Sequence, residues 1–150
     1  MAPGRMTMPS ADRSAPLPIE ANLALGVVVF HFAIVLLHAA AHFHYEIPLP
    51  VWQRVYVGTA IYAAPLAAGG LLVARRLVAG AWVLLVSMVS AALFNIYFHF
   101  LLVGSDSVSS VSLDGWGLVF LGTAIFLAAT EIWGASVAAR LLRVARRARG

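Results

Sequence analysis

Four long apolar windows constrain this chain more than any other feature of its sequence. They cover residues 19–44, 51–74, 77–104 and 113–139. Each window reaches the roughly 20 apolar residues that a helix needs to cross a bilayer, and none shows the alternation of a barrel strand. The chain has 62% hydrophobic and 11% charged residues, whereas a soluble domain has about 25% charged residues. The sequence therefore predicts an all-α integral membrane protein with four transmembrane helices.

The connections between the windows predict how the helices are arranged. The separators "YEIPLP" and "GSDSVSSVS" carry the Pro, Gly and Ser residues that are typical of loops. Short connections make consecutive helices antiparallel neighbours, so we expect an up-down-up-down bundle. Pro65 predicts a kink in the second helix.

The placement of arginine predicts the orientation of the bundle. Arginine supplies all ten basic residues of the chain. Arg5 and Arg13 precede the first window, Arg75 and Arg76 separate the second window from the third, and five more arginines follow the fourth. Basic loops stay on the cytoplasmic side of a membrane. We therefore expect both termini in the cytoplasm and the protein in the cell membrane.

The two ends of the chain differ in composition from the windows. Residues 1–18 are rich in Pro, Ser and Ala, so they are predicted to be a disordered leader before the transmembrane domain of residues 19–139. Residues 140–150 form a basic tail. Beside a membrane span, such a tail favours anionic lipid headgroups over nucleic acid as a partner. The residues expected to contact lipid are Arg140, Arg143, Arg146 and Arg147.

A line of histidines runs along the first window. His31, His38 and His42 fall at i, i+7 and i+11. At about 100° per residue they lie within about 20° of one line, in a stripe about 16 Å long. His44 points away from this line, toward the membrane interface. Ionisable groups inside a span mark a functional site by default.

Depth in the bilayer indicates which polar residues can meet. The third predicted helix runs outward, so Asn95 and His99 lie one turn apart in its outer half. This is the expected level of His38 and His42. The candidate ligands are therefore His38, His42 and His99, supported by Asn95 and Tyr97.

Glu131 is expected at a deeper level. The fourth predicted helix descends from the outside, which puts Glu131 in the inner half of the bilayer. A carboxylic acid at that depth is costly unless it is paired or protonated. His31 lies at a similar depth, so we predict that His31 and Glu131 form a proton-linked pair.

Several chemistries fit the outer histidines. Two histidines at i and i+4 with a third from a neighbouring helix suit Cu, Zn or Fe. This layer has no carboxylate unless Glu46 folds back, and an all-histidine site favours Cu or Zn. Haem b, held by one histidine from each of two helices, also fits, as does a pocket for a quinone or a lipid headgroup. The absence of cysteine excludes thiolate ligands.

The leading hypothesis is a metal or haem site that serves redox chemistry or anchors a redox complex in the membrane. One alternative is a proton-coupled transporter or proton relay that uses the histidine stripe and Glu131. Another is a structural accessory subunit whose histidines pack helices together. Four spans are few for a transporter, so that alternative requires a homo-oligomer or partner membrane subunits. No phosphate loop, HExxH motif or nucleophile elbow is present, and the sequence leaves enzymatic activity open.

Overall fold

The computed structural model describes residues 16–147, which form helices and loops without a strand. Four helices of this range are long and apolar enough to cross a membrane, as the sequence predicts. The first is α1 (Ile19–His44), and the second is a continuous run of α2 (Val51–Tyr56), η1 (Val57–Ala63) and α3 (Ala64–Val73). The third joins α4 (Leu77–Ile96) to η2 (Tyr97–Leu101), and the fourth is α5 (Gly115–Arg147).

The helix bounds agree with the predicted windows for α1 and differ elsewhere. The third helix ends at Leu101, before the predicted residue 104, because Leu102 turns to extended backbone. The helix α5 runs on to Arg147, so most of the predicted basic tail continues the last helix. Its Ala, Leu and Arg residues are strong helix formers. Residues 1–15 of the predicted leader and Arg149 lie outside the described residues.

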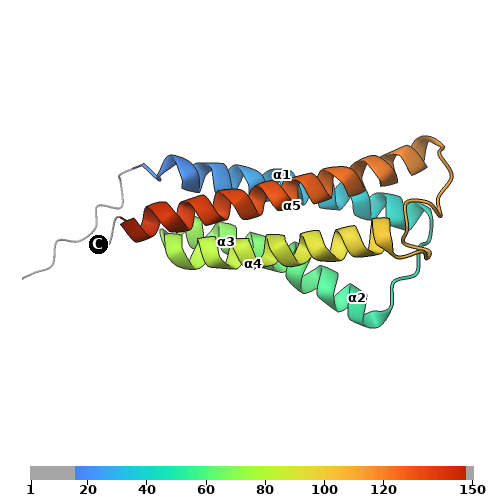
Figure 1. Cartoon of the computed structure of the whole chain (residues 1–150), viewed down its shortest axis with the longest axis horizontal. Helices are drawn as coiled ribbons and strands as arrows, with labels where there is room; N and C mark the ends of the chain where they lie inside the picture. Colours follow the sequence, from blue (N-terminus) through green and yellow to red (C-terminus); the bar gives the residue numbers. More distant parts are fainter. Residues whose placement is uncertain (1–15, 148–150) are drawn as a thin grey trace, which may run out of the picture.

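The helices pack in the order α1, α5, α4, α3. Figure 1 shows α1 and α5 side by side above α3 and α4, with the start of α1 and the end of α5 at the same end of the molecule. The core near that end is made of small and medium side chains, including Ala24, Val27, Met88 and Ala138. Small side chains allow helices to approach closely in a membrane, so this end of the bundle is tightly packed.

At the other end of the molecule, α2 diverges from the bundle (Figure 1). The segment that joins α2 to α3 is η1, a π-helix in which each N–H donates to the carbonyl five residues back. Pro65 follows η1 in the first turn of α3. Proline has no N–H, and its ring clashes with the carbonyl four residues earlier, so a regular α-helix is disfavoured here. The irregularity predicted at Pro65 takes the form of this π segment.

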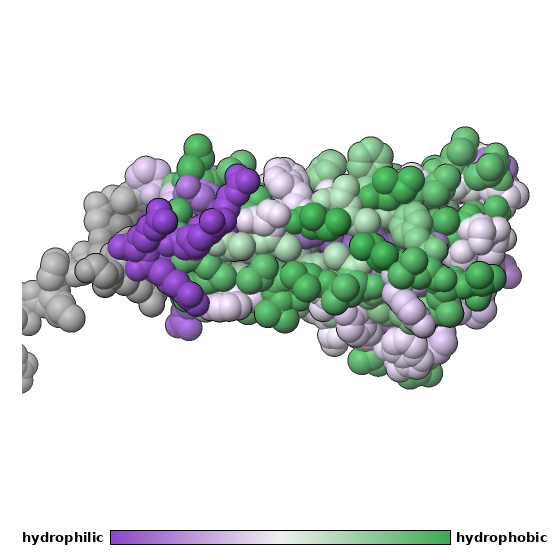
Figure 2. Space-filling view, in the orientation of Figure 1, coloured by the Kyte–Doolittle hydropathy of each residue, from purple (hydrophilic) through white to green (hydrophobic). Residues whose placement is uncertain are grey.

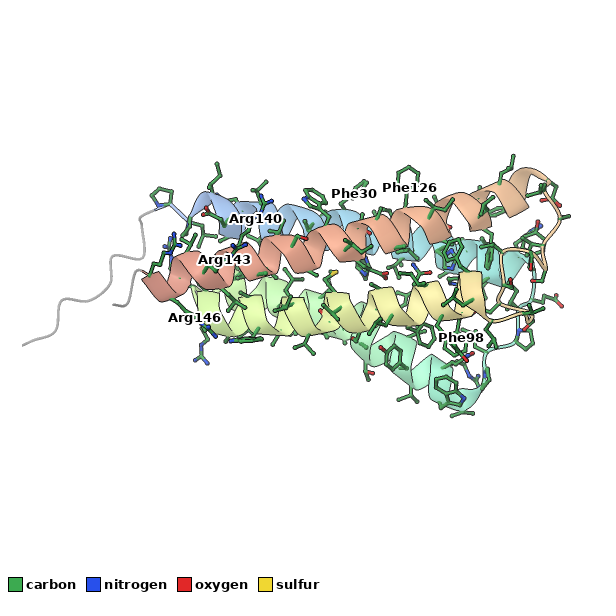
Figure 3. All side chains as sticks on the ribbon, viewed as in Figure 1. Phe30, Phe98, Phe126, Arg140, Arg143 and Arg146 are labelled. Atoms are coloured by element: carbon green, nitrogen blue, oxygen red, sulfur yellow. The ribbon has the colours of Figure 1, made fainter. Side chains whose placement is uncertain are left out.

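Aromatic contacts hold α2 against α4. The Tyr56 hydroxyl donates to the Ser90 carbonyl at 2.9 Å, and the Tyr56 ring stacks on Phe94 with centroids 4.7 Å apart. The Trp52 ring lies 5.6 Å from Phe98 of η2, which projects toward α2 (Figure 3). The second helix therefore follows α4 in this half of the bundle and leaves α1.

The outside of the bundle is apolar. Phe30 and Phe126 are 49% and 58% exposed and point outward from α1 and α5 (Figure 3). Figure 2 shows a mostly hydrophobic face with a hydrophilic patch at the end of α5, where Arg140, Arg143 and Arg146 project (Figure 3). Soluble proteins rarely expose apolar patches of this extent. Together with the four long apolar helices, this surface indicates a multi-pass membrane protein.

Asp114 ties the start of α5 to the end of α1. The Gly117 N–H donates to Asp114 Oδ1 at 2.9 Å, which is the hydrogen bond of a helix N-cap. Ser112 Oγ donates to Oδ2 and the Tyr45 hydroxyl donates to Oδ1, both at 2.6 Å. The hydrogen bonds from Ser112, Tyr45 and Gly117 hold the pKa of Asp114 well below its usual value.

Gly134→Ala is expected to lower the midpoint of thermal unfolding in detergent. A Cβ at residue 134 would lie 2.9 Å from Val27 Cγ1 and 3.0 Å from Met88 Cγ. Extra volume in a well-packed core costs about 1–3 kcal/mol. Gly122→Ala is the matched control on α5, since a Cβ there meets nothing within 4 Å. The control should leave the midpoint unchanged or raise it, and equal effects of the two substitutions would contradict close packing at Gly134.

Asp114→Asn is expected to lower the unfolding midpoint at neutral pH. Because the pKa of Asp114 is depressed in the folded state, the carboxylate contributes stability above its unfolded pKa of about 3.9 and loses that contribution as the pH falls through the folded pKa. The difference between wild type and variant should be constant from about pH 5 to 8 and shrink below about pH 4. Tyr45→Phe, which removes one of the donors, should show a smaller difference. A difference that ignores pH would overturn this account.

Candidate metal centre

His38, His42 and His99 come together near the C-terminal end of α1. His38 Nε2 lies 3.1 Å from His99 Nε2 and 3.2 Å from His42 Nε2. The ligating nitrogens of all three lie within 4.8 Å of one another. His38 and His99 are buried, and His42 is half-buried. The structure thus groups the three residues that the sequence predicts as one site.

The spacing of these nitrogens suits a single ion. In a tetrahedral site with metal–nitrogen bonds of about 2.0–2.1 Å, neighbouring ligand atoms lie about 3.3 Å apart. The two measured separations from His38 Nε2, 3.1 and 3.2 Å, are close to that value. The imidazoles need little movement to share one ion.

Hydrogen bonds at the Nδ1 atoms, which face away from the cluster, assign the tautomers of two imidazoles. His99 Nδ1 lies 2.7 Å from the Asp106 carbonyl oxygen, which only accepts, so His99 Nδ1 carries the proton. His38 Nδ1 lies 2.8 Å from Thr123 Oγ1. The Thr123 hydroxyl donates its hydrogen to the Val119 carbonyl at 2.6 Å. Its oxygen therefore accepts a hydrogen bond from His38 Nδ1. Both neutral imidazoles therefore carry a lone pair on Nε2.

These two lone pairs face each other. The His38 and His99 Nε2 atoms are 3.1 Å apart, and neither has a hydrogen to give once the Nδ1 protons are in place. Two such acceptors repel unless a cation, either a proton or a metal ion, lies between them. Metal-bound histidines are held in the same way, with the outer N–H on a carbonyl or another acceptor that orients the ring.

Asp106 brings a carboxylate to the cluster from the loop after η2. Its Oδ1 lies 3.1 Å from His42 Nε2 and 3.3 Å from His99 Nδ1. The loop is fastened by the Val108 N–H, which donates to the His99 carbonyl at 3.0 Å. Glu46, the carboxylate considered from the sequence, is exposed and has a positive φ of 49°. The carboxylate that contacts the histidines is therefore that of Asp106 and not that of Glu46.

The helix η2 sets the direction of His99. It is a π-helix, and the Leu102 N–H donates to the Tyr97 carbonyl five residues back at 2.8 Å. A π segment inserts an extra residue into the turn and is frequent at functional sites. The change of register separates His99 from Asn95, which the sequence places on one face.

Two buried residues of α5, Phe120 and Thr123, also shape the centre. The Phe120 ring lies 4.9, 5.2 and 5.4 Å from the rings of His38, His42 and His99 and forms an apolar wall. Thr123 lies one turn further along α5. A phenylalanine and a threonine in an apolar window resemble packing residues, so only the α1–α5 contact identifies them.

Asn95 contacts Glu131. Its Nδ2 donates to Glu131 Oε2 at 3.3 Å and to the Ala124 carbonyl at 3.2 Å. Glu131 is completely buried. His31 is also buried, and it has no hydrogen bond of good geometry within residues 16–147, although the Ile61 backbone is close enough to interact with it. The predicted pair of His31 and Glu131 stays a prediction.

Two other residues lie outside the cluster. Tyr97, predicted as a supporting residue, is 49% exposed, and its ring contacts Phe98 edge-on at 4.9 Å. His44 is exposed and stacks on Trp116 with centroids 4.9 Å apart. Neither side chain reaches the three histidines.

A cavity of about 850 Å³ lies beside the histidines, between α1, η1 and α4. Its polar lining includes the three histidines together with Asp106, Asn95 and Glu131. Its size falls within the range of small-molecule sites, about 300–1,000 Å³. Comparisons with protein families, with curated proteins and with solved structures find no match to this chain.

The assigned tautomers can be measured by nitrogen-15 NMR of histidine-labelled protein treated with a chelator. At mildly alkaline pH, His38 and His99 should be protonated on Nδ1, because Thr123 and the Asp106 carbonyl accept there. Thr123→Val removes one acceptor and should change the spectrum of His38 while leaving that of His99. Exposed His44 serves as the internal reference. Protonation of both rings on Nε2 would contradict the assignment.

Proposed function

We propose that this protein binds one transition-metal ion through the Nε2 atoms of His38, His42 and His99 and the carboxylate of Asp106. The observation that carries the proposal is the pair of Nε2 lone pairs that face each other at 3.1 Å. Their outer nitrogens are held by Thr123 and by the Asp106 carbonyl. A cation at the centre removes the repulsion and uses every lone pair.

The donor set narrows the choice of ion. Imidazole suits Cu, Zn and Fe, and a carboxylate beside it extends the all-histidine preference for Cu or Zn toward Fe. A bound Cu or Fe ion would supply one-electron chemistry, whereas Zn would act as a Lewis acid. We propose a redox role, either in this chain alone or as a membrane subunit of a redox complex.

The geometry favours a bare ion over haem b. Haem takes its two axial histidines on opposite faces of a flat macrocycle. Here the Nε2 atoms of three histidines meet, with His38 Nε2 only 3.1 and 3.2 Å from the other two, and Asp106 joins them. This arrangement suits one point charge better than a macrocycle between two rings.

The geometry also gives less support to the proton relay. A relay from His42 to Glu131 needs a continuous chain of hydrogen bonds. In residues 16–147 the chain from His42 reaches His38 and His99 and does not continue to His31, whose ring nitrogens lack a partner of good geometry. A purely structural role for the histidines would require a proton between the facing lone pairs of His38 and His99.

We further propose that the bundle is antiparallel, with both termini in the cytoplasm of the cell and the metal centre in the outer half of its membrane. The arginine distribution supports this orientation. The inner end would then carry Arg140, Arg143, Arg146 and Arg147 at the level of anionic lipid headgroups. The exposed apolar faces leave room for partner subunits or for a second copy of the chain.

Metal analysis tests the proposal. Protein purified in detergent, stripped with a chelator and reloaded with Cu, Zn or Fe(II) is expected to retain about one ion per chain, because the site has about the four ligands of a complete coordination shell. His99→Ala should abolish retention, and Thr123→Val should weaken the affinity about 10–100-fold, as is usual for a residue that orients a ligand. His44→Ala is the matched control and should retain the ion.

Two results would overturn the metal site. One is a His99→Ala variant that keeps its helical circular dichroism and binds the ion as tightly as wild type. The other is a Soret band in the absorption spectrum, which would show haem in place of a bare ion.

A further inference from the structure

The cavity beside the histidines begins at the surface of the bundle. Exposed Phe43, Glu46 and Arg54 line it at the end where α1 and α2 diverge. Phe43 is 83% exposed and belongs to the apolar exterior. A molecule dissolved in the bilayer can therefore reach the cavity between α1 and α2.

The walls of the cavity are apolar for most of its length. They include Val35, Ile61, Phe94 and Leu127. Tyr62 adds a second aromatic side chain to the lining. Such walls suit a ring and an alkyl chain.

The deep end of the cavity is polar and incompletely satisfied. Asn95 and Glu131 line it and are 3% and 0% exposed. Their mutual hydrogen bond uses Asn95 Nδ2 and Glu131 Oε2. Asn95 Oδ1 and Glu131 Oε1 are buried and have no hydrogen-bond partner in the described part of the chain. A buried polar atom without a hydrogen bond costs free energy, so a ligand that forms hydrogen bonds with both atoms would bind favourably here.

The chemistry of the two oxygens selects a hydroxyl group. Asn95 Oδ1 can only accept a hydrogen bond. Glu131 Oε1 accepts when the carboxyl is ionised and can donate when it is protonated. A hydroxyl can give its single hydrogen to Asn95 Oδ1 and accept from Glu131 Oε1 when the carboxyl is protonated, so in that state it satisfies both atoms. An ether can accept from the protonated carboxyl but leaves Asn95 Oδ1 unpaired, and an alkyl group satisfies neither atom.

We propose that this cavity binds a lipid-soluble phenol, which enters from the bilayer between α1 and α2. Its hydroxyl lies between Asn95 Oδ1 and Glu131 Oε1, its ring lies beside the imidazoles and Phe94, and its tail extends past Phe43. The assignment of this phenol as the substrate of the centre rests on the proposed redox metal site, while its binding does not.

Binding of 4-nonylphenol to chelator-treated protein in detergent tests the proposal, and native mass spectrometry counts the adducts. One molecule per chain is expected. The methyl ether of the same compound keeps the ring and tail but has no hydroxyl hydrogen, and it should bind at least about tenfold more weakly because Asn95 Oδ1 stays unpaired. Equal binding of phenol and ether would overturn the proposal.

Variants locate the hydroxyl. Asn95→Leu removes the acceptor of the hydroxyl hydrogen and should reduce the preference for the phenol over the ether. Glu131→Met removes the donor to the ligand oxygen and should weaken the binding of both compounds, whereas Glu131→Gln keeps an N–H donor there and should retain most of the affinity. Thr130→Val is the matched control, because the buried Thr130 hydroxyl bonds to carbonyls of its own helix. An unchanged preference in Asn95→Leu would overturn this placement.

Repeating the titration with metal-loaded protein and with His99→Ala separates the two proposals. Phenol binding without metal retention would reject the metal centre alone. Metal retention with equal affinity for phenol and ether would reject the phenol site alone. Neither Asn95 nor Glu131 is a proposed ligand, so the preference for the phenol should persist in His99→Ala.

Discussion

The close approach of three imidazole Nε2 atoms is the constraint on which one end of the bundle, opposite the start of α1, depends. His38 and His99 present lone pairs to each other at 3.1 Å, in a setting where an unsatisfied polar group is costly. The surrounding contacts hold this arrangement. Thr123 and the Asp106 carbonyl keep the protons on the far nitrogens, and Phe120 packs against all three rings. These contacts come from α1, α5, η2 and the loop that follows η2, so the centre also joins the ends of those elements.

The divergence of α2 follows from local chemistry and has a consequence for access. Pro65 disfavours regular helix, the π-helix η1 precedes it, and aromatic contacts with Phe94 and Phe98 bind the outer part of the second helix to α4. Because α1 packs on α5 while the second helix follows α4, the space between α1 and η1 stays open and forms the cavity. His38, His42 and His99 form part of the wall of this cavity.

The sequence predicts the spans and the histidine group because both follow from helical periodicity and bilayer thickness. The spacing of His38 and His42 and the depth of His99 are enough to bring them to one level. The carboxylate was not predictable in this way, because the position of Asp106 depends on the path of a Ser-rich loop. The π-helical turn at Tyr97–Leu101 also changes the register after Asn95. Asn95 contacts Glu131, which the sequence places at a different depth.

The direction and length of the Glu131 side chain explain how this residue reaches Asn95 and the cavity. Side chains on a helix lean toward its N-terminus, and the N-terminus of α5 lies at the end of the histidine centre. The carboxyl group therefore reaches back to Asn95, which also bonds to Ala124, seven residues before Glu131 on α5. The tightly packed small-residue core begins below this level, at Val27, Met88 and Gly134. Glu131 thus lies at the boundary between the tightly packed core and the half of the bundle in which the cavity and the histidines meet.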